Sequence, residues 1–159
     1  MKNFQFQKDG KTFWYSRAVV CVTGLFLIDD NGHQWVLANK RGTATQNEQG
    51  KWNLPVGFLD FDETCRQCAA REIFEETGVE ISEKILSLYN VNSNPDDGNQ
   101  DVGMRYTGYL HGTPDDYPVN LKHMEKNEAT AAKWILVEEV DSYEWAWNHR
   151  ELIKLFIKN

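Results

Sequence analysis

The sequence predicts an α+β domain in which a mixed β-sheet is packed between helices, as an α/β/α sandwich. Most of the chain reads as strands and turns, a strongly helical segment interrupts the strands at about residues 63–77, and a second helical segment covers residues 145–157. Strands interrupted by one helix and followed by another are typical of a sheet covered by helices. The 159 residues suffice for one domain with its own core, so we expect a single domain over residues 1–159.

Composition and charge exclude several classes of protein. Hydrophobic residues make up 41% of the chain and charged residues 26%, as in an ordinary folded domain. No run approaches the roughly 18 apolar residues of a membrane helix, and the first ten residues lack a signal peptide's apolar stretch, so we expect a cytoplasmic protein without a membrane partner. The net charge of −7 argues against a nucleic-acid partner, because phosphate contacts favour a basic face.

The first predicted element is an N-terminal β-hairpin over residues 4–16. Two aromatic-rich runs flank Asp9 and Gly10, and Asp-Gly between such runs is a strong signal for a tight hairpin turn. We therefore treat residues 1–16 as a hairpin extension that precedes the rest of the domain.

The remaining strands are predicted from short apolar or β-branched runs bounded by turn residues. The run at 18–28 is the most apolar and predicts a buried strand. Pro55 disfavours a helical conformation at Leu54, so the segment at 52–54 is expected to be extended. The expected strands cover residues 18–28, 35–39, 52–54, 85–91, 102–110 and 133–137.

Two helices complete the prediction. Asp60 or Asp62 can cap the helix at 63–77, and Gly78 is a typical residue just past a helix end. The segment at 145–157 is amphipathic and would pack one side on the sheet. Its predicted core residues are Trp145, Leu152, Leu155 and Phe156.

Three glutamates are expected to share one face of the first helix. At about 100° per residue, Glu75 and Glu76 lie roughly −60° and +40° from Glu72. Like charges at this spacing repel, and a helix C-terminus disfavours anions, a conflict of local rules that is expected at functional sites. Oxygen ligands of this kind suit Mg²⁺ or Mn²⁺, and the adjacent Arg71 could hold one carboxylate. The alternative is an acidic face in contact with solvent.

The residues around this cluster resemble the signature of the Nudix family. Gly57 is followed by five residues and Glu63, and seven further residues lead to the segment REIFEETGV at 71–79. This fills every fixed position of the Nudix box, GX5EX7REUXEEXGU, in which U is a bulky aliphatic residue. The match is dense over residues 52–79.

The resemblance implies a Nudix fold and a metal-dependent hydrolase. Members of the family hydrolyse nucleoside diphosphates linked to another group X, with Mg²⁺ or Mn²⁺ as the cofactor. The resemblance further implies that Arg71 orients a glutamate of the cluster and that Glu63 supports the motif through a salt bridge. The metal ligands that it implies are Glu72, Glu75, Glu76 and the backbone carbonyl of Val56.

The reaction needs a base to take a proton from the attacking water. A bound metal lowers the pKa of that water and neutralises the phosphate oxygens, and a carboxylate then accepts the proton. The candidates are Glu75 on the helix and Glu128 in a later loop, whose position resembles that of the family's glutamate after the box. The alternative for Glu128 is a loop glutamate in contact with solvent.

Substrate contacts are expected from the basic first third of the chain and from the start of the motif. Residues 1–51 contain seven bases and four acids, a net +3, and arginine suits two-pronged phosphate recognition. The candidates are Arg17, Arg41, Gly57 and Phe58.

Cys65 and Cys68 have the spacing of half a zinc site. A zinc site normally needs four ligands, and the sequence offers no second pair, so the favoured interpretation is small side chains that fill space beside the glutamates. The four histidines are scattered, and no role is assigned to them.

Several functions remain open on the sequence alone. The favoured reaction is hydrolysis of a nucleotide sugar such as ADP-ribose, because the aromatic hairpin could add a strand or form a pocket shared in a homodimer. The alternatives are a pyrophosphatase of (oxidised) nucleoside triphosphates, a nucleotide-sensing module without catalysis, and an isomerase of an isoprenyl diphosphate that would use a cysteine.

Overall fold

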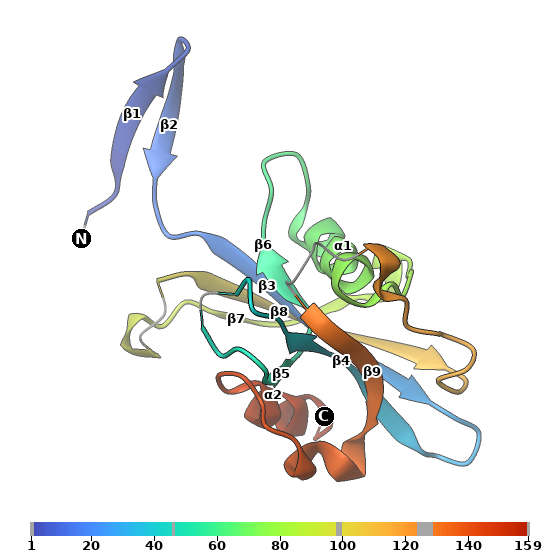
Figure 1. Ribbon diagram of the computed structural model, residues 1–159. Helices are drawn as coiled ribbons and strands as arrows, with labels where there is room; N and C mark the ends of the chain where they lie inside the picture. Colours follow the sequence, from blue (N-terminus) through green and yellow to red (C-terminus); the bar gives the residue numbers. More distant parts are fainter. Residues whose placement is uncertain (1, 46, 98–99, 124–128, 159) are drawn as a thin grey trace.

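The structure is a computed structural model that describes residues 2–45, 47–97, 100–123 and 129–158. Within these residues, a two-stranded hairpin precedes a seven-stranded sheet (Figure 1). The strands are β1 (Phe4–Lys8), β2 (Lys11–Tyr15), β3 (Val19–Ile28), β4 (Gln34–Arg41), β5 (Trp52–Asn53), β6 (Val56–Phe58), β7 (Ser87–Asn92), β8 (Val102–His111) and β9 (Ala129–Leu136). The helices are α1 (Cys65–Thr77), α2 (His149–Phe156) and the short 3-10 helices η1 (Glu83–Ile85), η2 (Pro95–Asp97), η3 (Leu121–His123) and η4 (Val137–Ser142). None of the helices described combines the length and apolar character needed to cross a bilayer.

The sheet is mixed, as predicted. Its order is β5-β4-β3-β8-β7, with β6 also paired to β3 and β9 also paired to β4. Strands β3 and β8 run parallel, and the other strand pairs of this sheet are antiparallel.

Strand β3 changes its partner along its length. Residues 20–22 pair with β6, whereas residues 26–28 pair with β4. Between these two stretches, the backbone N–H of Thr23 donates to the carbonyl of Pro55, just before β6. Strands β3 and β4 are therefore separated in the part of β3 that precedes residue 26, and β6 pairs with β3 there.

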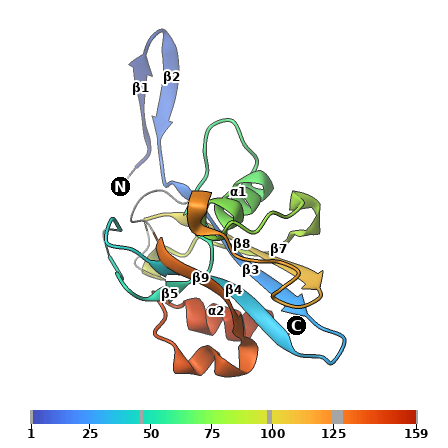
Figure 2. The same cartoon turned by 45° about the vertical axis from the view of Figure 1, so that its right-hand side comes forward.

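Helices α1 and α2 cover opposite faces of the sheet (Figures 1 and 2). Successive side chains of β3 point to opposite faces. Leu25 packs in one buried cluster with Ile73 of α1, and Phe26 packs in another with Phe156 of α2. The observed arrangement is the predicted α/β/α sandwich.

The start of α1 differs from the prediction. The helix begins at Cys65, and its N-cap is Thr64, so the predicted caps Asp60 and Asp62 are wrong. The reason is a capping box: the N–H of Gln67 donates to the Thr64 hydroxyl at 3.2 Å, and the N–H of Thr64 donates to the Gln67 amide oxygen at 2.8 Å. Gly78 ends the helix with φ 74°, as predicted.

Helix α2 is shorter than the predicted segment at 145–157. Residues just before it pair with β5 instead, because the Trp52 N–H donates to the Glu144 carbonyl at 2.8 Å and the Ala146 N–H donates to the Trp52 carbonyl at 2.7 Å. Leu155 was expected in the core but is 40% exposed, since it lies on the outer side of this shorter helix. The other predicted core residues are buried, namely Trp145, Leu152 and Phe156.

The strand predictions agree with the structure to within a few residues, with two exceptions. Strand β6 was not predicted, because three residues after a proline carry no periodic signal. Strand β9 begins at Ala129, four residues before the predicted start at 133. Its added residues pair with the end of β4, a tertiary contact that the sequence pattern does not show.

The N-terminal hairpin is confirmed and extends away from the sheet in both views (Figures 1 and 2). Asp9 and Gly10 have φ values of 51° and 72°, the positive values that a tight hairpin turn requires. The Phe4 and Tyr15 rings stack across the strands with centroids 4.8 Å apart. Their outer faces stay exposed, so the hairpin contributes little to the core of its own chain.

Candidate active site

Arg71 lies at the centre of the predicted glutamate face of α1. Its Nε donates to Glu63 at 3.0 Å and its Nη2 donates to the other oxygen of Glu63 at 2.7 Å. Its Nη1 donates to both Glu72 at 2.7 Å and Glu75 at 2.8 Å, and Nη2 also donates to the Phe58 carbonyl at 3.0 Å. One guanidinium therefore joins two glutamates of the cluster to the supporting glutamate and to β6.

These contacts shift the pKa values of the cluster. Hydrogen bonds from Arg71 lower the pKa of Glu63 to about 2. The carboxylates of Glu63, Glu75 and Glu72 in turn raise the pKa of Arg71. Glu72 behaves differently, because burial raises its pKa although Arg71 opposes that shift. Glu72 is thus a carboxylate whose charge is costly without a compensating cation.

Strand β6 presses against the same helix face. A Cβ atom added to Gly57 would lie 1.9 Å from Oε1 of Glu72, so only glycine permits this close approach. The neighbouring Val56 donates its N–H to Oε2 of Glu76 at 3.0 Å. Val56 and Gly57, at the start of β6, therefore contact Glu76 and Glu72 of the motif.

The donor set suits a divalent cation, whereas the present arrangement of the side chains is not a metal cage. Carboxylate oxygens are the ligands that Mg²⁺ and Mn²⁺ prefer. Within the described residues, no three His, Cys, Asp or Glu side chains converge as a metal-binding group. The physical reason is that Glu72 and Glu75 bind Arg71 while Glu76 binds the Val56 N–H.

Cys68 fills space between α1 and β6. It is buried, and its thiol donates to the Phe58 carbonyl at 3.5 Å. A hydrogen bond with Cys21 and burial both raise the pKa of Cys68, so its thiol stays protonated. Cys65 is half-buried at the start of the helix. This placement agrees with the interpretation of small side chains beside the glutamates.

A cavity of about 520 Å³ opens where β3 and β4 separate. Its walls come from β3, β6, β8, the end of β4 and the start of α2. The predicted residues Arg41, Val56, Gly57 and Phe58 line it, and the sequence did not indicate Arg105, Trp147 or His149, which also line it. No local pattern marks these three, because they meet only after distant strands and α2 come together.

Arg41 is held in the cavity by several groups. Its Nε donates to the Asn47 carbonyl at 3.1 Å, and its guanidinium carbon lies 4.4 Å from the centroid of the Trp147 ring. Burial lowers the pKa of Arg41, while the charge of Glu76 opposes that shift. The cavity thus holds a partly desolvated cation in the electrostatic field of the motif.

His149 closes the inner end of the cavity as a neutral side chain. It is buried, and its Nδ1 accepts a hydrogen bond from the Leu54 N–H at 3.0 Å. Burial lowers the pKa of His149 to about 3, and the nearby charges of Arg41 and Arg105 add to the shift. This histidine links α2 to the segment that leads into the motif.

Of the remaining predicted residues, one is described away from the cavity wall and one is not described. The guanidinium of Arg17 donates to the backbone carbonyls of Ser93 and Asp101, and Arg17 is not among the lining residues. It fixes the segment around Asp101, which does line the cavity. Glu128 lies outside the residues that the structure describes.

Two bacterial proteins are similar to this chain in sequence. The ADPR responsive transcriptional repressor NtrR of Acinetobacter baylyi is 26% identical over 129 residues, which are 79% of this chain and 47% of the relative. The NAD-capped RNA hydrolase NudC of Vibrio atlanticus is 32% identical over 74 residues, which are 46% of this chain and 25% of the relative. The chain therefore spans about half the length of the first relative and a quarter of the second.

Solved structures share the fold. The NUDIX domain of Shewanella oneidensis NrtR, complexed with ADP ribose, matches with a TM-score of 0.72 and 22% identity over 91% of this chain and 88% of that chain. A bifunctional NMN adenylyltransferase/ADP ribose pyrophosphatase of Francisella tularensis, complexed with AMP and a Mn ion, matches with a TM-score of 0.68 and 21% identity over 89% of this chain and 41% of that chain.

The family model of the NUDIX domain matches residues 19–156, which include both helices and the whole seven-stranded sheet. The hairpin strands β1 and β2 lie before the matched region. Since the matched region also contains every residue of the motif and the cavity beside it, the chain belongs to the Nudix family.

Proposed function

We propose that this protein hydrolyses a pyrophosphate linkage in a nucleoside diphosphate linked to another group, with a nucleotide sugar such as ADP-ribose as the favoured substrate. The observation that carries the proposal is the double role of β6. Its residues Val56, Gly57 and Phe58 line the cavity, and the same three residues contact the glutamate cluster or Arg71. A substrate in the cavity would therefore lie against the motif.

Glu72, Glu75 and Glu76 would hold Mg²⁺ or Mn²⁺ as the cofactor, with the Val56 carbonyl as a further oxygen ligand. When bound, the metal would neutralise phosphate oxygens and acidify an attacking water. Glu72 is partly buried, and burial raises its pKa, so it is the glutamate whose charge such a cation would stabilise most.

Of the two candidates for the catalytic base, Glu75 is the one that lies among the residues the structure describes. Half of its side chain is exposed, so water can reach it, and Arg71 orients its carboxylate at 2.8 Å. Accepting a proton at Glu75 would weaken its bond to Arg71, which keeps Glu63 and Glu72 as partners. Glu128 remains the alternative base, because its position in the sequence resembles that of the family's glutamate after the box.

Arg41 and Arg105 are proposed to bind the diphosphate, because both are arginines in the cavity wall. Phe58, exposed at the same wall, would contact the nucleoside or the sugar. Arg17 is proposed to act on substrate binding indirectly, through its bonds to the carbonyls of Ser93 and Asp101. The lean to ADP-ribose is supported by the two structural neighbours whose names or ligands include it.

The test is a Mg²⁺-dependent turnover assay followed by ³¹P NMR. The substrates are ADP-ribose, other nucleotide sugars, intact and oxidised nucleoside triphosphates, and an isoprenyl diphosphate. Hydrolysis of ADP-ribose to AMP and a sugar phosphate is expected, with loss of activity in EDTA and in Glu75→Gln. Preferred hydrolysis of a triphosphate would overturn the substrate assignment. Isomerisation that needs Cys68 and survives Glu75→Gln would overturn the reaction.

A second candidate function is nucleotide sensing without catalysis. A relative named an ADPR responsive transcriptional repressor favours it, and so does the engagement of Glu72 and Glu75 by Arg71. Because the aligned region is 47% of that relative, only recognition of ADP-ribose is proposed here, and the net charge of −7 still predicts no nucleic-acid partner. Tight ADP-ribose binding with no turnover of any substrate would select this function.

We also propose that the hairpin mediates a homodimer. Residues 2–17 contain four bases and one acid, a net +3, whereas the whole chain has a net charge of −7. A second copy offers the acidic surface that such a hairpin would favour. Light scattering should give twice the chain's mass, and a variant without residues 2–16 should be monomeric. A monomeric full-length chain would contradict the proposal.

A further inference from the structure

We propose that Trp147 is a positioning residue that holds the Arg41 guanidinium in the cavity for the anionic diphosphate of the substrate. The inference rests on the proposed function, because it assigns a residue to the same cavity. Trp147 lies outside the sequence motif, in the turn that precedes α2. Three features of Trp147 support this role: its backbone conformation, its contact with Arg41 and the exposure of its indole.

The backbone of Trp147 is strained. Its φ is 50°, a left-handed value that bulky side chains rarely adopt. Such strain persists only where the surrounding structure imposes it, and it concentrates at ligand sites. The flanking residues impose it here: Ala146 donates to the Trp52 carbonyl at 2.7 Å, and the His149 ring accepts from the Leu54 N–H at 3.0 Å.

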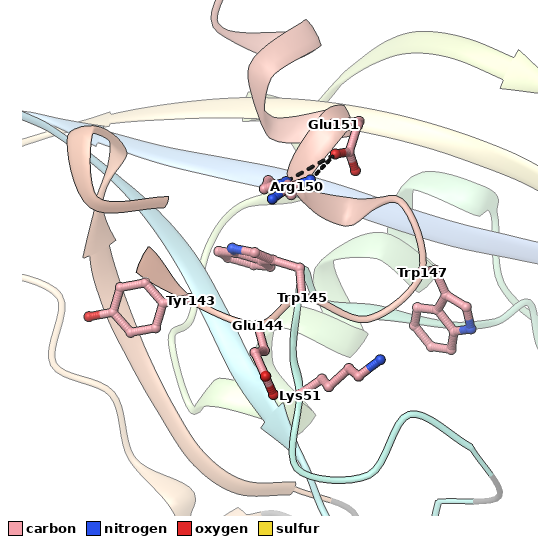
Figure 3. A pocket seen from close by; sticks show the side chains of 7 residues that line it. All are labelled: Lys51, Tyr143, Glu144, Trp145, Trp147, Arg150 and Glu151. Atoms are coloured by element: carbon pink, nitrogen blue, oxygen red, sulfur yellow. Dashed lines mark hydrogen bonds and ion pairs between the residues drawn. The ribbon is translucent and has the colours of Figure 1, made fainter. Parts of the chain in front are cut away.

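Core packing does not explain a tryptophan at this position. Trp147 is 46% exposed, whereas the nearby Trp145 is 8% exposed and donates its indole N–H to the Val140 carbonyl at 2.7 Å. Trp147 borders the 520 Å³ cavity and also a second pocket of about 290 Å³. Figure 3 shows it across that second pocket from Tyr143. Its indole is thus a wall between two hollows. Its ring also contacts that of the buried His149 at a centroid distance of 5.0 Å, so a smaller residue that relieves the strain would lose this one ring contact.

The contact with Arg41 gives the indole a task. The Arg41 carbon Cζ lies 4.4 Å from the ring centroid, and Asn47 accepts from Nε on the same guanidinium. An aromatic face on one side and a carbonyl at one edge fix the plane of the guanidinium. A planar fork fixed in advance binds phosphate oxygens with a smaller loss of conformational freedom. Val56, whose N–H donates to Glu76, lines the same cavity as Arg41, so the fork faces the cavity that borders the glutamate cluster.

The experiment measures binding of a non-hydrolysable methylene analogue of ADP-ribose by calorimetry in Mg²⁺. Trp147→Asn should raise Kd roughly tenfold, the order of a desolvated cation–π contact. It should leave thermal stability unchanged or higher, because asparagine tolerates positive φ. Trp147→Phe keeps an aromatic face and should change Kd by less than about threefold. Trp145→Phe, which alters a buried indole in the same segment, is the control and should lower stability while leaving Kd nearly unchanged.

A double-mutant cycle separates positioning from general structural damage. In an Arg41→Ala background, Trp147→Asn should have no further effect on Kd, because it acts through Arg41. Equal Kd for the wild type and Trp147→Asn, or additive effects with Arg41→Ala, would overturn the inference and leave the proposed function intact. If the wild type binds the analogue but hydrolyses no nucleotide, the hydrolase proposal fails and the inference stands. A wild type that does not bind the analogue overturns the inference.

Discussion

The carboxylate of Glu72 lies against the backbone of Gly57, at a place where any Cβ atom would be 1.9 Å from Oε1 of that carboxylate. The glycine at the start of the motif and a glutamate fifteen residues later are thus one structural unit. The two residues meet because β6 pairs with β3 in the sheet and α1 packs on the face of the same sheet. The spacing of the motif is the chain length needed to bring these two residues together.

Gly57→Ala should abolish most of the activity. The added methyl group must displace the Glu72 carboxylate, and a misplacement of about 1 Å at a catalytic group can reduce the rate on the order of 100-fold. Steady-state hydrolysis of ADP-ribose measures the loss. Gly103→Ala is the control for a glycine in the same cavity wall, because its Cβ would meet the nearest atom at an ordinary 3.8 Å. Equal rates in both variants would show that the close approach has no role.

Arg71→Met should lower the free energy of unfolding by about 3 kcal/mol, since it leaves partly buried carboxylates without their cation. Glu63 and Glu72 have side chains that are 12% and 13% exposed in their ion pairs with Arg71. Urea unfolding monitored by fluorescence gives the value. The matched variant is Arg150→Met, which removes an exposed pair with Glu151 and should cost far less, because solvent screens that pair. Similar losses in the two variants would contradict a special role for Arg71.

His149 should make the protein less stable in mild acid. Its pKa is about 3 in the folded chain, mainly because of burial, and an unfolded histidine has a pKa of about 6.5. The unfolded chain therefore binds the extra proton between these values, so stability is complete above about pH 6.5 and falls as the pH is lowered. We expect the free energy of unfolding to be about 2 kcal/mol lower at pH 5 than at pH 7.

His149→Asn serves as the comparison for this pH effect. The asparagine oxygen can accept from the Leu54 N–H in place of the imidazole nitrogen but does not titrate. Its unfolding energy should change little between pH 7 and pH 5. The same acid loss in both proteins would assign the effect to other groups.

Gly24→Ala should destabilise the sheet–helix contact by about 1–3 kcal/mol through overpacking. A Cβ atom at Gly24 on β3 would lie 2.6 Å from Cδ2 of Phe156 on α2. Thermal unfolding measures the loss, and Phe156→Leu in the same background makes room for the methyl group. The double variant should be less destabilised than the sum of the two single variants. Strict additivity would argue against a direct clash.

Local sequence patterns predicted the elements that depend on nearby residues. The hairpin at Asp9 and Gly10, the end of α1 at Gly78 and the apolar strand β3 follow from turn chemistry and periodicity over a few residues. The errors have the same origin. The N-cap of α1 is Thr64, and not an aspartate, because Gln67 completes the capping box. Pairing with β5 shortens α2 at its start, and Leu155 lies on the helix side away from the buried Leu152, Ile153 and Phe156.

The sequence by itself determined the chemistry of the site, since the spacing of Glu63, Arg71 and the three glutamates depends only on one loop and one helix. Only the tertiary structure decided what surrounds that chemistry. Arg105, Trp147 and His149 come from β8 and from the start of α2, and they meet Arg41 where β3 and β4 separate. The guanidinium of Arg17, which the sequence placed among the candidate phosphate contacts, donates to two backbone carbonyls. The physical reason is range: helix periodicity acts over a few residues, whereas a cavity wall forms only after segments more than a hundred residues apart have packed together.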